Sequence, residues 1–178
     1  MVRMATQGMT EKDLEGGGDY PAPGMYHVSI SNARELVDDN YVQLDFTVMA
    51  GAPADPAAGD QRGKRISERY YITGTTEEAT EKLMKRLARV AVSVGLIDKS
   101  QIGQDLDIDF TMAEGRDCVI RVKKEKYTVK KGENAGQERE RASVDFLGIW
   151  STDHEEVTQG PKDAGVSSNG SKESFDDI

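Results

Sequence analysis

One amphipathic segment, residues 75–95, divides the strand-like parts of this chain into two groups. Its apolar side chains recur at spacings of four and three, which places them on one face of a helix. Thr75 and Glu78 have the spacing of a capping box, and Gly95 stands where a left-handed residue ends a helix. We therefore expect one helix here. Alternating, strand-like segments precede and follow it, at residues 26–30, 41–49, 64–73, 116–129 and 142–150.

The order of these segments indicates the fold class. Five strands interrupted by a single helix after the third are the chain order of an OB barrel. We therefore expect a mainly β domain at residues 20–152, a five-stranded OB-type Greek-key barrel with one α-helix between strands three and four. Residues 1–19 are polar and end in a run of glycines, which predicts a flexible N-terminal arm. Residues 153–178 are acidic and poor in apolar side chains, which predicts a disordered C-terminal tail.

The charge of the chain is unevenly distributed. The formal net charge is −9, which taken alone argues against a nucleic-acid partner. The two ends carry most of it, with −2 in residues 1–19 and −5 in residues 151–178. Two segments are basic instead, since residues 61–74 have a net charge of +3 and residues 115–141 one of +4. Positive charge is thus concentrated on the third and fourth strands and on the hairpin that follows.

These basic segments coincide with the surface on which OB barrels usually hold oligonucleotides, the face of strands two and three and the loop between strands four and five. Alternation along the third strand places Arg65, Arg69 and Tyr71 on one face, next to Tyr41 of the second strand. The hairpin adds cationic groups for phosphates and a ring on which a base can stack. These hairpin residues are Lys123, Lys126, Tyr127, Lys130 and Lys131. We predict that both sets bind single-stranded nucleic acid.

Other interpretations of neighbouring residues compete with this one. Lysines on a long hairpin often form only a solvated edge that discourages strand pairing. Tyr70 shares its parity with Ile66 and Ile72, so we expect it in the core rather than in a binding site. Trp150 lies four positions after Phe146 in the last strand, so both should be on the same face of it, and we expect both in the barrel core as well.

Several stretches together carry a resemblance to a known family. They are PGMYHVSI, VQLDFTVMAG, GKRISERYYITG, KRLARVAVSVGLID and EGRDCVIRVKKEKYTVKKGENAGQERERASVDFLGIWST, and they cover most of residues 20–152. The chain resembles a phage-encoded, uncharacterised family related to OB-fold single-stranded-DNA-binding proteins. This resemblance implies a protein of phage DNA replication or recombination, which would work in the cytoplasm of a bacterial host cell.

The end of the chain carries a second resemblance. Its last residues, ESFDDI, follow a charged, polar segment. They resemble the acidic C-terminal peptide of bacterial single-stranded-DNA-binding proteins, which recruits partner proteins and competes with DNA for the basic groove. The resemblance implies that this tail binds replication or recombination proteins. The residues concerned are Phe175, Asp176, Asp177 and Ile178. The tip differs from the bacterial peptides in lacking a proline and in ending in isoleucine, and a merely solubilising tail is the competing interpretation.

Few residues are suited to catalysis or to metal binding. The sequence contains only two histidines, His27 and His154, so few residues could serve as the base of a catalytic triad. Cys118 is the only cysteine, which excludes an internal disulfide and fits a reducing compartment. Residues 105–109 have the aspartate spacing that opens a calcium loop, but the required glycine and closing glutamate are missing. We expect no enzymatic activity, no cofactor and no bound metal, and no segment has the length of a membrane span.

The sequence as a whole predicts a non-catalytic protein that binds single-stranded DNA in phage replication or recombination. The alternative is an OB-fold protein–protein interaction module of a phage replication complex that does not bind nucleic acid. The oligomeric state stays open, and a homo-oligomer is compatible with the sequence.

Overall fold

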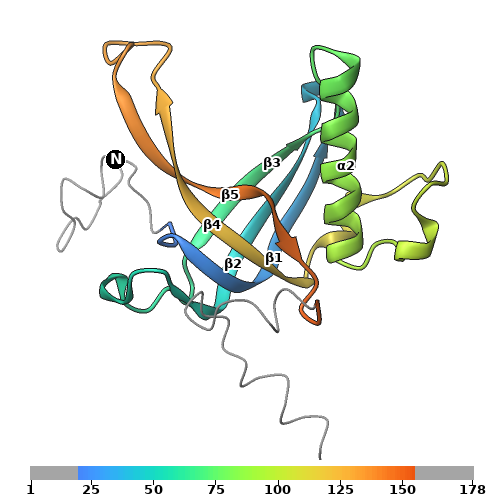
Figure 1. The fold of residues 1–178 in the computed structure, drawn as a ribbon, viewed down its shortest axis with the longest axis horizontal. Helices are drawn as coiled ribbons and strands as arrows, with labels where there is room; N and C mark the ends of the chain where they lie inside the picture. The colour runs from blue at the N-terminus through green and yellow to red at the C-terminus, as the bar shows by residue number, and fades with distance from the viewer. Residues whose placement is uncertain (1–19, 155–178) are drawn as a thin grey trace, which may run out of the picture.

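Five strands and one α-helix form the part of the chain that the structure describes, residues 20–154 of a computed structural model (Figure 1). The strands are β1 (Gly24–Leu36), β2 (Tyr41–Pro53), β3 (Arg65–Tyr71), β4 (Asp117–Thr128) and β5 (Glu138–Trp150). The helix is α2 (Glu77–Ser93), and short 3-10 turns occur at Val37–Asp39, Pro56–Ala58, Lys99–Gln101 and Phe110–Ala113. The predicted N-terminal arm and nearly all of the predicted C-terminal tail lie outside the described residues.

The strands form one antiparallel sheet in the order β3-β2-β1-β4-β5, so β3 and β5 are its two edges. The sheet curves until these edges approach each other, while the β4–β5 hairpin rises away from the rest of the sheet (Figure 1). The predicted mainly β architecture, with one helix between the third and fourth strands, is confirmed. The sheet itself is open, and its closure into an OB barrel stays a prediction.

The main hydrophobic core lies between one face of the sheet and α2. Alternation along β1 and β4 places Tyr26 opposite Ile120 and Val28 opposite Cys118, and all four side chains are buried. The Tyr26 hydroxyl donates a hydrogen bond to the Ala22 carbonyl at 2.7 Å, and burial raises the pKa of this tyrosine to about 12. Alternate side chains of both strands therefore form this part of the core.

Helix α2 begins and ends within the predicted segment. Its N-cap is Thr76, whose hydroxyl accepts a hydrogen bond from the Ala79 backbone N–H at 3.1 Å, so the predicted cap at Thr75 is wrong by one residue. Gly95 has a φ of 73°, the left-handed conformation expected after the helix. Neither α2 nor any other helix within residues 20–154 is long and apolar enough to cross a membrane.

The register of β5 differs from the prediction because this strand contains a large bulge. Val144 lies opposite Val122 and Ile149 opposite Ile120, so residues 145–148 face a single residue of β4. Phe146 lies within the bulge and is 43% exposed, so its predicted place in the core is wrong. Gly148 permits the bulge, since a Cβ there would lie 2.8 Å from the Cβ of Asp145.

Trp150 is buried, but on the opposite side of the sheet from the main core. It pairs with Val119, which alternates with the core residues of β4, and packs with Val119 and Met25 in a separate small cluster. The guanidinium carbons of Arg121 and Arg89 lie 4.9 and 5.6 Å from its ring. The predicted burial of Trp150 is confirmed, whereas its predicted place in the barrel core is wrong.

Cys118 offers a direct check of the core. Its thiol is buried between β1 and β4, and burial raises its pKa above the usual range for cysteine. Since the thiolate is the reactive form, we expect the native protein to react negligibly with an aromatic disulfide reagent and to release one equivalent of chromophore after unfolding in guanidinium chloride. Rapid labelling of the native protein would contradict the placement of β1 against β4.

Candidate nucleic-acid interface

The predicted residues of β2 and β3 form one cluster on the sheet face that points away from the main core. Tyr41 pairs with Tyr71, and Gln43 pairs with Arg69, so their side chains share this face. The Tyr41 and Tyr71 rings make an edge-to-face contact with centroids 5.8 Å apart, and the guanidinium carbon of Arg69 lies 4.7 Å from the Tyr41 ring centroid. Two exposed or half-exposed rings and one cation therefore lie within direct contact of each other.

Arg65 lies further along the same face of β3, opposite Thr47. Arg69 is four positions further along the strand, so the two guanidinium groups project from the same side of the strand at positions about 13 Å apart along it. Ser67 lies between them. The predicted arginines of the third strand thus share one surface.

The carboxylate of Asp45 is the acidic group at the centre of this face. It accepts hydrogen bonds from Asn32, Gln43 and Ser67, and Arg34 lies 3.6 Å away. Burial would raise the pKa of Asp45, but these hydrogen bonds outweigh it and hold the pKa below the usual range. Because neighbouring groups already satisfy this carboxylate, its charge is partly compensated within the protein.

The hairpin residues divide between two faces. Lys123 and Tyr127 alternate with Lys126, so Lys126 projects from the opposite face of the hairpin. Of these three predicted residues, only Lys123 and Tyr127 therefore share the hairpin face that lines the groove described below. Lys130 and Lys131 are exposed at the tip, beyond the ends of both strands.

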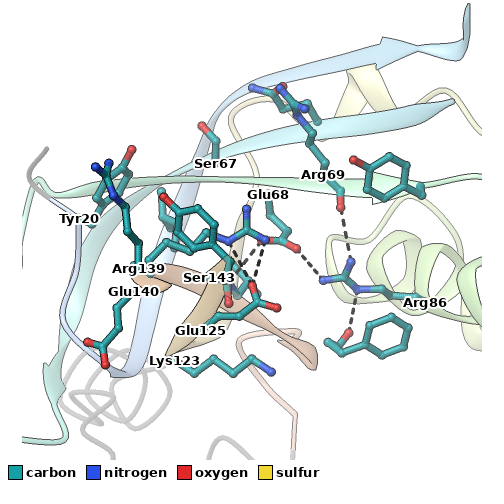
Figure 2. A pocket seen from close by; sticks show the side chains of 18 residues that line it. Tyr20, Ser67, Glu68, Arg69, Arg86, Lys123, Glu125, Arg139, Glu140 and Ser143 are labelled. Carbon is teal, nitrogen blue, oxygen red and sulfur yellow. Dashed lines mark hydrogen bonds and ion pairs between the residues drawn. The ribbon is translucent and has the colours of Figure 1, made fainter. Parts of the chain in front are cut away.

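A groove of about 870 Å³ joins the outer face of β3 to the hairpin face that carries Lys123 and Tyr127. Five basic side chains and three acidic ones line it, although the whole chain is acidic. The basic ones are Arg69, Arg86, Lys123, Arg139 and Arg141, and the acidic ones are Glu68, Glu125 and Glu140. Four aromatic rings contribute as well, from Tyr20, Tyr71, Tyr127 and Phe146. Figure 2 shows the groove from close by, with Arg69 and Lys123 on opposite sides of it.

A buried ion pair at the base of this groove connects the two edges of the sheet. Arg86 donates to Glu68 at 2.9 Å, to the Phe146 carbonyl at 2.9 Å and to the Arg69 carbonyl at 3.4 Å (Figure 2). Glu68 in turn accepts a hydrogen bond from the backbone N–H of Val144 at 3.3 Å. Burial raises the pKa of Glu68, and the hydrogen bond from Arg86 opposes that rise. Side chains thus link β3 to β5 where no backbone ladder does.

The cations around the groove differ in whether an acid neutralises them. Arg141 pairs with Glu125 at 3.1 Å, and Lys123 pairs with Asp145 at 3.1 Å. Within residues 20–154, the groove-lining side chains of Arg69 and Arg139 have no carboxylate partner, and neither does Arg65, which is not among the groove-lining residues. These three arginines are therefore the cations most readily available to an anionic ligand.

Arg139, Arg141 and Arg86 were not among the predicted site residues. Arg139, Arg141 and Ser143 are alternate residues of β5, so their side chains lie on the same face of the hairpin. The alternation of the hairpin sequence could therefore have predicted that both arginines line the groove. Arg86 lies on the buried face of α2, next to Leu87 and Val90. The spacing of the apolar residues in the helix sequence predicts this position. Its partner Glu68 interrupts the apolar face of β3, so two charges at buried positions were visible in the sequence.

The potential metal-ligating side chains of residues 20–154 are scattered. That part of the chain contains no group of three or more histidine, cysteine, aspartate or glutamate side chains placed to hold a metal ion. His27 lies 3.7 Å from Asp117, away from the groove-lining set. The predicted tail residues Phe175 to Ile178 lie outside the described residues. No protein-family model and no curated protein matches this chain.

Proposed function

We propose that this protein binds single-stranded DNA without catalysis, in the groove between the outer face of β3 and the β4–β5 hairpin. One observation carries the proposal: in a chain of net charge −9, the groove is lined by more basic than acidic side chains, interleaved with aromatic rings. An OB fold is part of this proposal, and the chain order of three strands, one helix and two strands supports it. In OB folds the face of strands two and three and the loop between strands four and five usually hold oligonucleotides. A role in phage DNA replication or recombination is part of the same proposal.

Binding depends on two kinds of side chain, aromatic rings that stack on bases and cations that pair with phosphates. Stacking of a base on an aromatic ring contributes about 1–3 kcal/mol and is tolerant of sequence. Tyr71, Tyr127 and Phe146 are 43%, 37% and 43% exposed, so bases can reach them. Arginine guanidinium groups match phosphate oxygens by paired hydrogen bonds. The groove therefore suits a flexible strand whose bases are free to leave the stack, rather than a duplex, whose bases are already paired.

A titration with fluorescent oligo-dT and with duplex DNA of equal length tests this function. We expect oligo-dT to bind more tightly than duplex, and its affinity to fall steeply between about 50 and 200 mM salt because bound cations release counterions. Fluorescence anisotropy measures both. The absence of oligo-dT binding would favour the interaction module that does not bind nucleic acid, and equal affinity for duplex would contradict the stacking role of the rings.

A further inference from the structure

A serine hydroxyl in the groove has no hydrogen-bond partner. Ser143 is 8% exposed and lines the groove, and its Oγ is buried with no partner among the described residues. Buried hydroxyls are nearly always paired, because leaving one unpaired loses the hydrogen bonds that water would make. Ser143 faces Lys123 across the strand pair and lies beside Glu125 (Figure 2). The Ser143 hydroxyl is therefore free to make a hydrogen bond to a ligand in the groove.

Two cationic residues share the hairpin face of Ser143, and the side chain of each is paired with a carboxylate. Arg141 makes two hydrogen bonds to Glu125 Oε2, at 3.1 and 3.2 Å, and its guanidinium carbon lies 5.3 Å from the Tyr127 ring centroid. Lys123 lies 3.1 Å from Asp145. Both ion pairs are partly exposed to solvent, so they are weak and can exchange.

We propose that Lys123, Arg141 and Ser143 form a subsite for one backbone phosphodiester of the bound strand, and that Glu125 occupies the subsite when no strand is present. This inference rests on the proposed function and deepens it. A phosphodiester offers Arg141 two oxygens in place of the single oxygen of Glu125, and gives the Ser143 hydroxyl an acceptor. Binding then exchanges one anion for another on Arg141.

This exchange has a consequence for affinity. Glu125 must leave Arg141 when phosphate arrives, and its negative charge stays close to the incoming one. Removing that charge while keeping the shape of the side chain therefore strengthens binding. At a separation of about 4 Å in water, one such repulsion corresponds to about a fivefold change in the dissociation constant.

The test compares Glu125→Gln with Glu81→Gln in the full chain, by titration with fluorescent oligo-dT. Glu81 pairs with Lys85 at 2.6 Å on α2 and is not among the groove-lining residues, so its variant removes the same charge from outside the groove. We expect Glu125→Gln to lower the dissociation constant about fivefold and Glu81→Gln to leave it within about twofold of the unmodified protein. Equal effects of the two variants, or weaker binding by Glu125→Gln, would overturn the subsite.

A second variant checks the hydroxyl. We expect Ser143→Ala to weaken oligo-dT binding about threefold, the loss of one modest hydrogen bond, with an unchanged melting temperature. Unchanged affinity would remove Ser143 from the subsite and overturn the proposal as stated. Inorganic phosphate at matched ionic strength should not displace the oligonucleotide, and displacement at low concentration would identify free phosphate as the occupant instead.

These outcomes separate the subsite from the proposed function. If oligo-dT does not bind the unmodified protein, the function and the subsite both fail. If oligo-dT binds and Glu125→Gln behaves like Glu81→Gln, single-stranded DNA binding stands and only the subsite fails.

Discussion

Replacing Arg86 with methionine is expected to lower the free energy of unfolding by about 3–5 kcal/mol at about pH 7. The Arg86 side chain is only 7% exposed, and it satisfies Glu68 together with the carbonyls of Phe146 and Arg69. Arg86→Met leaves the Glu68 carboxylate buried without its cation and both carbonyls without their donor. Urea unfolding followed by circular dichroism measures the change.

The pH dependence of Arg86→Met identifies Glu68 as the cause. Burial already raises the pKa of Glu68, and loss of Arg86 removes the main effect that opposes this rise. A carboxyl whose folded-state pKa is raised disfavours the folded state above that pKa and ceases to do so once protonated. The deficit of Arg86→Met should therefore shrink as the pH falls through the raised pKa of Glu68. A second replacement, Glu68→Gln, should likewise recover part of the lost stability at about pH 7.

The matched control for Arg86→Met is Lys85→Met, one residue earlier on α2. Lys85 is exposed, and among the described residues it forms an ion pair only with Glu81 on the helix surface. We expect this change to alter the free energy of unfolding by less than about 0.5 kcal/mol. A loss of similar size in the two variants would mean that the Arg86 pair does not connect β3 to β5 in solution.

Combined reversal of charge at Arg65 and Arg69 is expected to weaken binding of oligo-dT by about 100-fold or more. Both side chains project from the outer face of β3 without a carboxylate partner in residues 20–154, and Arg69 also lies over the Tyr41 ring. Arg65→Glu with Arg69→Glu therefore removes two available cations and places two anions in the path of the phosphates. Both positions are exposed, so the melting temperature should change little.

A second double variant separates local from overall charge. Lys82→Glu with Lys85→Glu changes the net charge of the chain by the same amount, on the exposed surface of α2. We expect this control to retain most of the binding, because salt screens charges that lie far from the strand. Equal retention of oligo-dT by the β3 variant and the unmodified protein would instead support the interaction module.

The strands were predictable because the alternation of apolar and polar residues is visible within each segment. Their lengths were not, because they depend on pairing with neighbouring strands. The fourth strand was predicted nearly to its observed end at Thr128, but β5 begins at Glu138, before its predicted start at residue 142, because charged residues continue the pairing with β4. Arg141 and Glu125 lie opposite each other there and form an ion pair across the strands. A search for apolar alternation places the start of such a strand too late.

The binding surface was predictable where parity alone decides which face a side chain occupies. Arg69 and Tyr71 follow the alternation of β3, and the structure brings them together as expected. Phe146 was misplaced because the bulge at residues 145–148 depends on the register with β4, and only Gly148 hinted at it. The pairing of Glu68 with Arg86 required knowing that α2 packs against β3 and β5, which no single segment reveals.

The Arg86–Glu68 pair also affects how separate molecules meet. An exposed strand edge is a template on which a strand of another chain can add, and charged side chains directed at such an edge discourage this. Here the pair occupies backbone groups of both edge strands, the Arg69 carbonyl on β3 and the Phe146 carbonyl and Val144 N–H on β5. The open sheet thus keeps its two edges near one another while offering fewer free groups for intermolecular aggregation.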